Sequence, residues 1–208
     1  MSLPTDRDTS DSAADHVADH NTLHGFYNTH SGTSASPVVL AETTLGSDTA
    51  NIEFASISAA YRHLRIEGQL RTTEASVTAG YLCVRVGNGS VDTGATNYRA
   101  FAYNVSGTDY TSAGRAEFIP GKIPAATADA DVFGHFEMLI HDYKGTTYWR
   151  LMTARCVYMA ATTAVGGYWD GQGQWKNKAN AINVVRVYPL TGNFLAGSSL
   201  RLIGIPAP

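Results

Sequence analysis

Apolar and polar residues alternate with a period of two along much of the chain after residue 37. In residues 61–70, Leu64, Ile66 and Leu70 occupy one set of alternate positions, and charged or polar side chains occupy the other. Residues 133–143 repeat the pattern, with apolar side chains at positions 136, 138 and 140. This alternation is typical of antiparallel strands that turn one face to a core and the other to water.

The C-terminal part of the chain carries a different strand pattern. Residues 182–188 have large side chains at both sets of alternate positions, which predicts a strand well inside a sheet. Pro189 lacks a backbone donor and ends that strand. Gly192-Asn193 and Gly197-Ser198 supply turn residues. The alternation over 200–205 then predicts a closing strand that fixes the end of the chain in the sheet.

The remaining strand-like runs decide the fold class. They lie at 38–45, 52–57, 81–86, 98–105, 115–119, 146–159 and 165–175. No helical pattern of ten or more residues appears after residue 30, and no internal repeat is visible. Many short strands without alternating helices are typical of a sandwich or a barrel. We therefore expect a mainly β protein, a jelly-roll-like antiparallel β-sandwich.

The first 36 residues form a separate region. Residues 1–12 are polar and predict a flexible arm, residues 12–28 predict one short helix, and residues 29–37 form a linker of small residues. Residues spaced three or four positions apart form one stripe along the predicted helix: Ala13, His16, His20, Leu23 and Tyr27. An isolated helix of this length is marginal in water, so we expect it to self-associate or to dock on a partner. The domain prediction is residues 1–36 for anchoring or oligomerisation and 37–208 for the β-sandwich.

Charge and composition narrow the function classes. The net charge is −3 without a basic block, which argues against a nucleic-acid partner. No run of 18 apolar residues is present and the first residues lack the apolar core of a signal peptide, so no membrane segment is predicted. Cys83 and Cys156 each lie in an apolar run, which favours free buried thiols over a disulfide.

Histidines occur in two patterns that resemble metal or acid–base sites. His16, His20 and His24 are spaced by four on the predicted helix, but the carboxylate of a zinc-binding helix motif is missing. His135 and Glu137 share one strand face with His141. In both cases we favour a helix interface or a solvated face, and we predict no metal, no cofactor and no catalytic residue.

Two alternatives to a purely structural role remain open. The Gly-rich segment around Tyr168, Trp169 and Trp175 is a candidate glycan-contact loop, although tryptophans buried in a core explain the same residues. A jelly-roll glycan hydrolase needs paired carboxylates, and no spacing pairs Glu117, Glu137 or Asp170. The sequence therefore favours a protein that is not an enzyme.

Several segments together resemble a family of virion surface proteins of tailed bacteriophages. The C-terminal resemblance rests on Trp175, Ala181-Ile182-Asn183, Gly192-Asn193-Phe194, Gly197-Ser198, Leu202 and Gly204-Ile205. Further similar segments are 48–68, Val84–Asn88 with Tyr98, and the N-terminal run 15–24. This resemblance implies a jelly-roll β-sandwich on the virion surface, usually oligomeric and without catalysis, assembled in the cytoplasm of the bacterial host.

Within that family, the short chain favours a capsid decoration, minor capsid or head-fibre protein. The implied partners are further copies of the chain, with a homotrimer favoured, and the major capsid protein or another virion protein. The alternative is a tail or baseplate protein that binds host-surface glycan.

Overall fold

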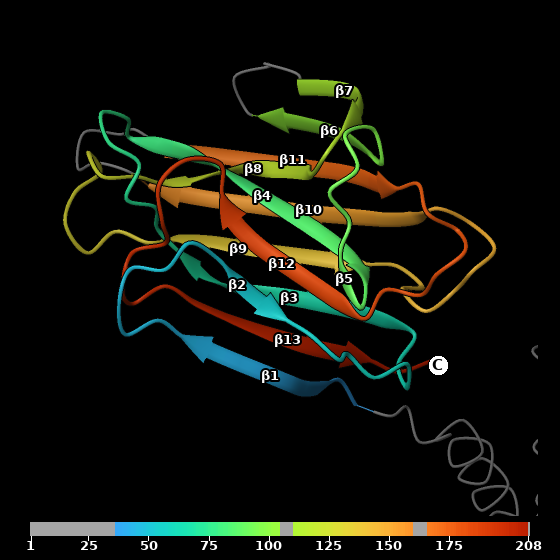
Figure 1. Cartoon of the computed structure of the whole chain (residues 1–208). Helices are drawn as coiled ribbons and strands as arrows, with labels where there is room; N and C mark the ends of the chain where they lie inside the picture. Colours follow the sequence, from blue (N-terminus) through green and yellow to red (C-terminus); the bar gives the residue numbers. More distant parts are fainter. Residues whose placement is uncertain (1–35, 105–109, 160–165, 208) are drawn as a thin grey trace, which may run out of the picture. The chain divides into compact units, whose positions relative to one another are not determined.

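The computed structural model of the chain describes residues 36–104, 110–159 and 166–207, which form two antiparallel sheets (Figure 1). The larger sheet has the strand order β1 (Val38–Thr44), β13 (Ser199–Ile205), β3 (His63–Leu70), β9 (Gly134–Ile140), β10 (Arg150–Met159), β11 (Gly166–Trp175), β6 (Tyr98–Asn104) and β7 (Tyr110–Arg115). The smaller sheet has the order β2 (Ile52–Phe54), β12 (Val184–Pro189), β4 (Ala79–Asn88) and β5 (Ser90–Val91), and β8 (Phe118–Pro124) pairs with β4.

The two sheets form a sandwich, as the alternation predicts. Figure 1 shows β4 and β12 of the smaller sheet in front of β9 and β10 of the larger one. The inward side chains of both sheets form one buried cluster, which includes Leu64, Ile66, Phe136, Met138 and Val187. The expected core faces of 61–70 and 133–143 are therefore confirmed.

The C-terminal strands lie where their patterns place them. β12 has β2 on one side and β4 on the other, so it lies inside the smaller sheet as predicted. Val185 and Val187 are buried, and Arg186 and Tyr188 on the other face are half-buried. β13 lies between β1 and β3 and so fixes the end of the described chain in the larger sheet.

Two expected boundaries need correction. The strand expected at 146–159 begins at Arg150, and residues 141–149 form the connection from β9. The segment 165–175, whose glycines suggested a loop or an irregular strand, is described from Gly166 on. It forms the regular strand β11, paired with β10 over its length and with β6 from Trp169 to Trp175.

The glycines of β11 allow β8 to lie close to the larger sheet. A Cβ atom on Gly171 would lie 2.6 Å from the carbonyl oxygen of Pro120, and a Cβ atom on Gly173 would overlap the ring of Phe118. Since Phe118 and Pro120 belong to β8, any larger residue at these two inward positions of β11 would push β8 away.

The turn that joins β12 to β13 holds one end of the sandwich together. Gly192 and Gly197 have φ values of 77° and 88°, which glycine adopts without strain. Phe194 between them is fully buried and bridges to Thr49 and Thr72. The segment that carries much of the phage-protein resemblance therefore performs a structural task here.

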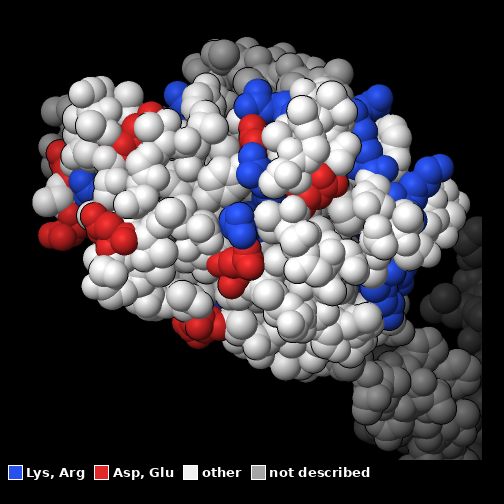
Figure 2. Space-filling view, in the orientation of Figure 1, with Lys and Arg blue, Asp and Glu red and all other residues white. Residues whose placement is uncertain are grey.

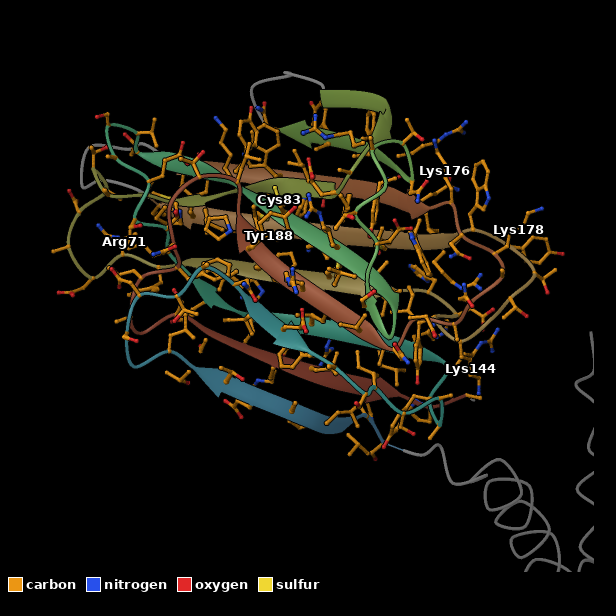
Figure 3. The ribbon with its side chains drawn as sticks, in the orientation of Figure 1. Arg71, Cys83, Lys144, Lys176, Lys178 and Tyr188 are labelled. Atoms are coloured by element: carbon orange, nitrogen blue, oxygen red, sulfur yellow. The ribbon has the colours of Figure 1, made fainter. Side chains whose placement is uncertain are left out.

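Arg71 ties a neighbouring loop to the same end of the molecule (Figure 3). Its buried guanidinium donates hydrogen bonds to the carbonyl oxygens of Asp129 at 2.7 Å, Ala128 at 3.0 Å and Val132 at 3.4 Å. A buried cation is stable here because loop carbonyls replace its lost hydration.

The predicted helix and its stripe, Ala13, His16, His20, Leu23 and Tyr27, lie outside the described residues. In the part of the chain that the structure describes, no helix is long and apolar enough to span a membrane.

Candidate binding face of the larger sheet

The outward face of the larger sheet carries rows of side chains that the strand register brings into line. One row places Arg201, Glu67, Glu137, Arg155 and Asp170 on five neighbouring strands. Two ion pairs hold it, from Arg155 Nε to Asp170 Oδ1 at 3.4 Å and from Arg201 Nε to Glu67 Oε1 at 3.7 Å. Such exposed pairs contribute little free energy, so the row mainly fixes the position of charges on the face.

Shallow hollows interrupt this row. One has a volume of about 220 Å³ and is lined by Glu137, Leu139, Thr153, Ala154, Arg155 and Asp170. A second, of about 360 Å³, lies over β1, β13, β3 and β9 and includes Glu67, His135 and Arg201. The face therefore offers charged, shallow depressions instead of a deep cleft.

Large apolar side chains lie next to the charged row on β10, β11 and β6. Met159 is 63% exposed and Tyr103 is 45% exposed, and Phe101 and Val157 are also exposed. Tyr168 lies directly opposite Val157 in the β10–β11 register. We call Phe101, Tyr103, Val157, Met159 and Tyr168 the apolar patch. Solvent-exposed apolar side chains gathered on one face mark a surface that other molecules cover.

Tyr168 is held in position by the charged row. Its hydroxyl donates a hydrogen bond of 2.6 Å to Asp170 Oδ2, and the Arg155 guanidinium lies 5.4 Å from its ring centre. The hydrogen bond to Asp170, with smaller contributions from burial and from the charge of Asp170, raises the pKa of the Tyr168 phenol. Tyr168 is therefore a fixed neutral ring and hydroxyl on the face.

The candidate glycan-contact residues are divided between the two faces of β11. Trp169 and Trp175 are 6% and 1% exposed and point into the core, whereas Tyr168 lies on the outward face. The Trp175 indole donates a hydrogen bond of 2.8 Å to Asp92 Oδ2 and so fastens the β5–β6 loop. The two tryptophans are thus core residues, and neither ring face is open to a sugar.

The histidines and carboxylates that the sequence singled out do not form one site. His135 and Glu137 lie on the outward face of β9. His141, just after β9, contacts the Thr153 hydroxyl at 3.3 Å and the ring of His63, with 5.7 Å between the ring centres. Glu137 and Asp170 line one hollow, but Arg155 lies between them in the register. Among the described residues, no group of three or more His, Cys, Asp or Glu side chains could hold a metal ion.

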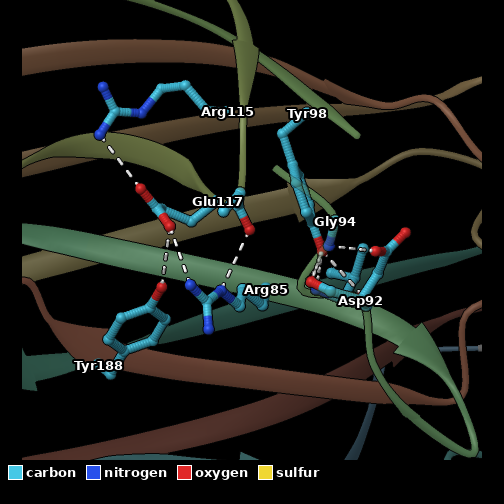
Figure 4. Close-up of polar contacts among 9 residues, drawn as sticks. Arg85, Asp92, Gly94, Tyr98, Arg115, Glu117 and Tyr188 are labelled. Atoms are coloured by element: carbon cyan, nitrogen blue, oxygen red, sulfur yellow. Dashed lines mark hydrogen bonds and ion pairs between the residues drawn. The ribbon is translucent and has the colours of Figure 1, made fainter. Parts of the chain in front are cut away.

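The outward face of the smaller sheet carries a compact set of ion pairs (Figure 4). Glu117 accepts hydrogen bonds of 3.1 Å from both Arg85 and Arg115 and one of 3.4 Å from Tyr188. Burial, with the nearby Cys83 and Glu117, raises the pKa of Tyr188 well above its ordinary value. Figure 2 shows basic and acidic side chains alternating across this face. Because the charges are paired with one another, this set stabilises the sheet rather than offering a free site.

Both cysteines are free and buried, as expected. Burial, and secondarily the charge of Glu117, raises the pKa of Cys83 to about 12. Burial alone raises the pKa of Cys156. Neither thiol has the lowered pKa that a nucleophile needs.

The sequence interpretation missed the apolar patch. Its signal was present, because Phe101, Tyr103, Val157 and Met159 occupy the outward positions of their strands, where polar residues are expected. On β6, the alternate residues Tyr98, Ala100 and Ala102 occupy the core positions. Reading both faces of each strand, rather than only the core face, would have found the patch.

No protein family model matches the chain, and no curated protein matches it. Among solved structures, CG-16, a homodimeric agglutinin from chicken liver, is 10% identical, with 80% of this chain and 99% of the agglutinin covered and a TM-score of 0.24. The CBM2 module of the evolved Dit of Lactobacillus casei BL23 phage J-1 is 8% identical, with 76% and 68% covered and a TM-score of 0.23. Scores this low transfer neither fold nor function to this chain.

Proposed function

We propose that this protein is a non-catalytic structural protein of a bacteriophage virion, a capsid decoration, minor capsid or head-fibre protein. The virion context comes from the sequence resemblance. The observation that supports a docking role is the apolar patch on the larger sheet, with Met159 and Tyr103 largely open to solvent. Covering such side chains on a neighbouring virion protein would release water from apolar surface, and symmetry would repeat the contact many times.

Each contact in this proposal is weak by itself. The patch lies beside the Arg155–Asp170 pair, so a partner surface must offer both apolar side chains and matched charges. An apolar centre with polar groups around it is the usual composition of a protein interface. A shell or fibre that repeats the contact gains stability by multivalency, and the chain needs no deep pocket for this purpose.

Co-sedimentation with virus particles that lack the protein tests the proposal. The full-length chain should bind such particles, and Met159→Lys should weaken binding by roughly tenfold or more, because it places a charge in the desolvated contact. Leu190→Lys is the matched control, since Leu190 is exposed but follows β12, outside the apolar patch. Equal binding of both variants would show that the apolar patch is not the docking surface. Absence of binding by the wild-type chain would contradict the docking role itself.

The oligomeric state is tested separately through the predicted N-terminal helix. We expect the full-length chain to be a trimer in solution and Leu23→Asp to shift it toward the monomer, because a charge would interrupt the apolar stripe. Mass measured by light scattering decides this. A wild-type monomer, or a trimer unaffected by the substitution, would contradict the role given to this helix.

A further inference from the structure

The connection between β9 and β10 exposes two consecutive aromatic side chains. Tyr148 is 76% exposed and Trp149 is 36% exposed. With Thr147, Gln174 and Lys178 they line a hollow of about 300 Å³, which we call the Tyr148–Trp149 hollow. It lies at the start of β10, and the apolar patch includes Met159 at the other end of the same strand. A strand of ten residues spans about 33 Å, so the two surfaces are separate.

The walls of this hollow are fixed by the protein itself. The buried Arg150 guanidinium donates hydrogen bonds to the carbonyl oxygen of Tyr148, in the connection before β10, and at 3.5 Å to that of Asn180, in the loop that follows β11. Asn177 accepts hydrogen bonds of 2.8 Å from Ala179 N–H and 3.2 Å from Asn180 N–H, which shapes the loop that carries Lys178. A ligand therefore meets a surface that is already ordered, which lowers the entropic cost of binding.

The chemistry of the lining combines flat apolar surface, amide and hydroxyl groups, and positive charge. Trp149 lies beneath the Arg99 guanidinium, whose central carbon is 5.0 Å from the ring centre. Gln174 of β11 lies opposite Arg99 of β6 in the strand register, so the Gln174 amide lies beside the Arg99 side chain. Amides and hydroxyls both donate and accept hydrogen bonds, as sugar hydroxyls do.

Positive charge is concentrated at this end of the molecule. The two connections 141–149 and 176–183 contain Lys144, Lys176 and Lys178 but a single carboxylate, that of Asp142. Figure 3 places the three lysines at the same end, and Figure 2 shows basic side chains predominating at that edge and acidic ones at the opposite edge. The overall charge of −3 makes this local excess distinctive.

We propose that the Tyr148–Trp149 hollow binds a saccharide that carries an acidic group, either carboxylate or phosphate. The Tyr148 ring, which is the more exposed of the two aromatic rings, contacts the apolar C–H face of a sugar ring beside Trp149. Gln174 and Thr147 hydrogen-bond the sugar hydroxyls, and Lys178 pairs with the acidic group. A nucleic acid fits less well, because the sequence contains no basic block that would follow a phosphate backbone. This site is independent of the docking role proposed above.

Isothermal titration of the full-length chain tests the site. The probes are a glucuronic-acid oligosaccharide, a glycerol-phosphate-substituted glucose oligomer, the unsubstituted glucose oligomer, and a single-stranded oligonucleotide. We expect at least one acidic saccharide to bind, and Tyr148→Ala to weaken it by roughly tenfold, the loss typical of a removed stacking ring. Tyr103→Ala is the matched control, because Tyr103 is an exposed aromatic residue of the same sheet outside the hollow.

A separate variant tests the contribution of positive charge to the affinity. Lys178→Gln should reduce affinity for the acidic probe roughly fivefold or more and leave affinity for a neutral sugar unchanged. The proposal is overturned if no acidic saccharide binds, if the neutral oligomer binds equally well, if Tyr148→Ala has no effect, or if the oligonucleotide alone binds. None of these outcomes changes the expected co-sedimentation with particles, so the two proposals fail separately.

Discussion

At the scale of single residues, the best test of the fold is Arg71, whose buried guanidinium donates to three loop carbonyls. Arg71→Met keeps the apolar stem but leaves those carbonyls unpaired. The free energy of unfolding measured in urea should therefore fall by about 2–4 kcal/mol. Arg201→Met removes only a half-exposed pair at 3.7 Å and should cost under about 0.5 kcal/mol. Equal losses for both variants would contradict the role of Arg71.

Asp92 gives the protein a defined acid sensitivity. Burial acts to raise the pKa of its carboxyl, but hydrogen bonds from Gly94 N–H, Trp175 and Asn97 outweigh burial and lower it below the ordinary 3.8. Figure 4 shows the bond from Gly94. Since the folded pKa lies below the unfolded one, this stabilisation is complete above about pH 4 and is lost as pH falls through the lowered value.

Substitution of Asp92 should follow that pH dependence. Asp92→Asn should destabilise the protein by about 1–2 kcal/mol at pH 7, and the difference from wild type should shrink toward pH 2. Urea unfolding at several pH values measures it. Glu42→Gln, at an exposed position of β1 outside this hydrogen-bond network, is the matched control for loss of a carboxylate. A difference that grows on acidification would contradict the assignment.

The raised pKa of the Cys83 thiol, about 12, predicts its reactivity. In the folded protein at pH 8, neither Cys83 nor Cys156 should react with iodoacetamide over hours, and both should react in urea, where the thiols titrate near their ordinary pKa. Mass spectrometry of the alkylated chain counts the modified sites. Rapid labelling of either thiol without denaturant would show that its strand opens or is placed wrongly.

At the scale of elements, the close approach of β8 to β11 is the contact most sensitive to side-chain size. Gly171→Ala puts a methyl group 2.6 Å from the Pro120 carbonyl oxygen and should cost about 1–3 kcal/mol in urea unfolding. Gly46→Ala is the control, because an added Cβ meets nothing within 4 Å there. If both variants are as stable as wild type, β8 does not lie on β11 as described.

The elements also show what the sequence can and cannot predict. Strand positions and core faces followed from alternation, because each strand has one face in a continuous core, as in β3 and β9. The regularity of β11 was not predicted because two of its inward positions, Gly171 and Gly173, carry no side chain. These glycines make room for β8, which comes from a distant part of the chain. The pattern of residues within one strand does not indicate which distant strand will pack against it.

The candidate site was predictable in part for the same reason. Tyr168, Trp169 and Trp175 lie on one strand, but the period of two sends Tyr168 outward and both tryptophans inward. The Tyr148–Trp149 hollow joins the β9–β10 connection to Gln174 and Lys178, some 25 residues later, and no local pattern links them. Only the strand register and the loop contacts of the folded chain show that these residues lie together.

At the scale of the whole molecule, the larger sheet divides along β10 into two surfaces of different character. One end carries the apolar patch around Met159 and Tyr168, and the other carries exposed aromatic rings beside Lys178. The smaller sheet instead pairs its charges internally through Glu117. The two proposals above therefore rest on different parts of the same sheet.

Burial of the apolar patch in assembled particles is the most direct test of the proposed function. Hydroxyl-radical footprinting would compare oxidation of Phe101, Tyr103 and Met159 in the free full-length protein and in particles that contain it. We predict that these three side chains are oxidised readily in solution and protected in the particle, while Tyr148 and Leu190 change little. Equal oxidation in both states, or protection confined to the smaller sheet, would contradict docking through the larger sheet.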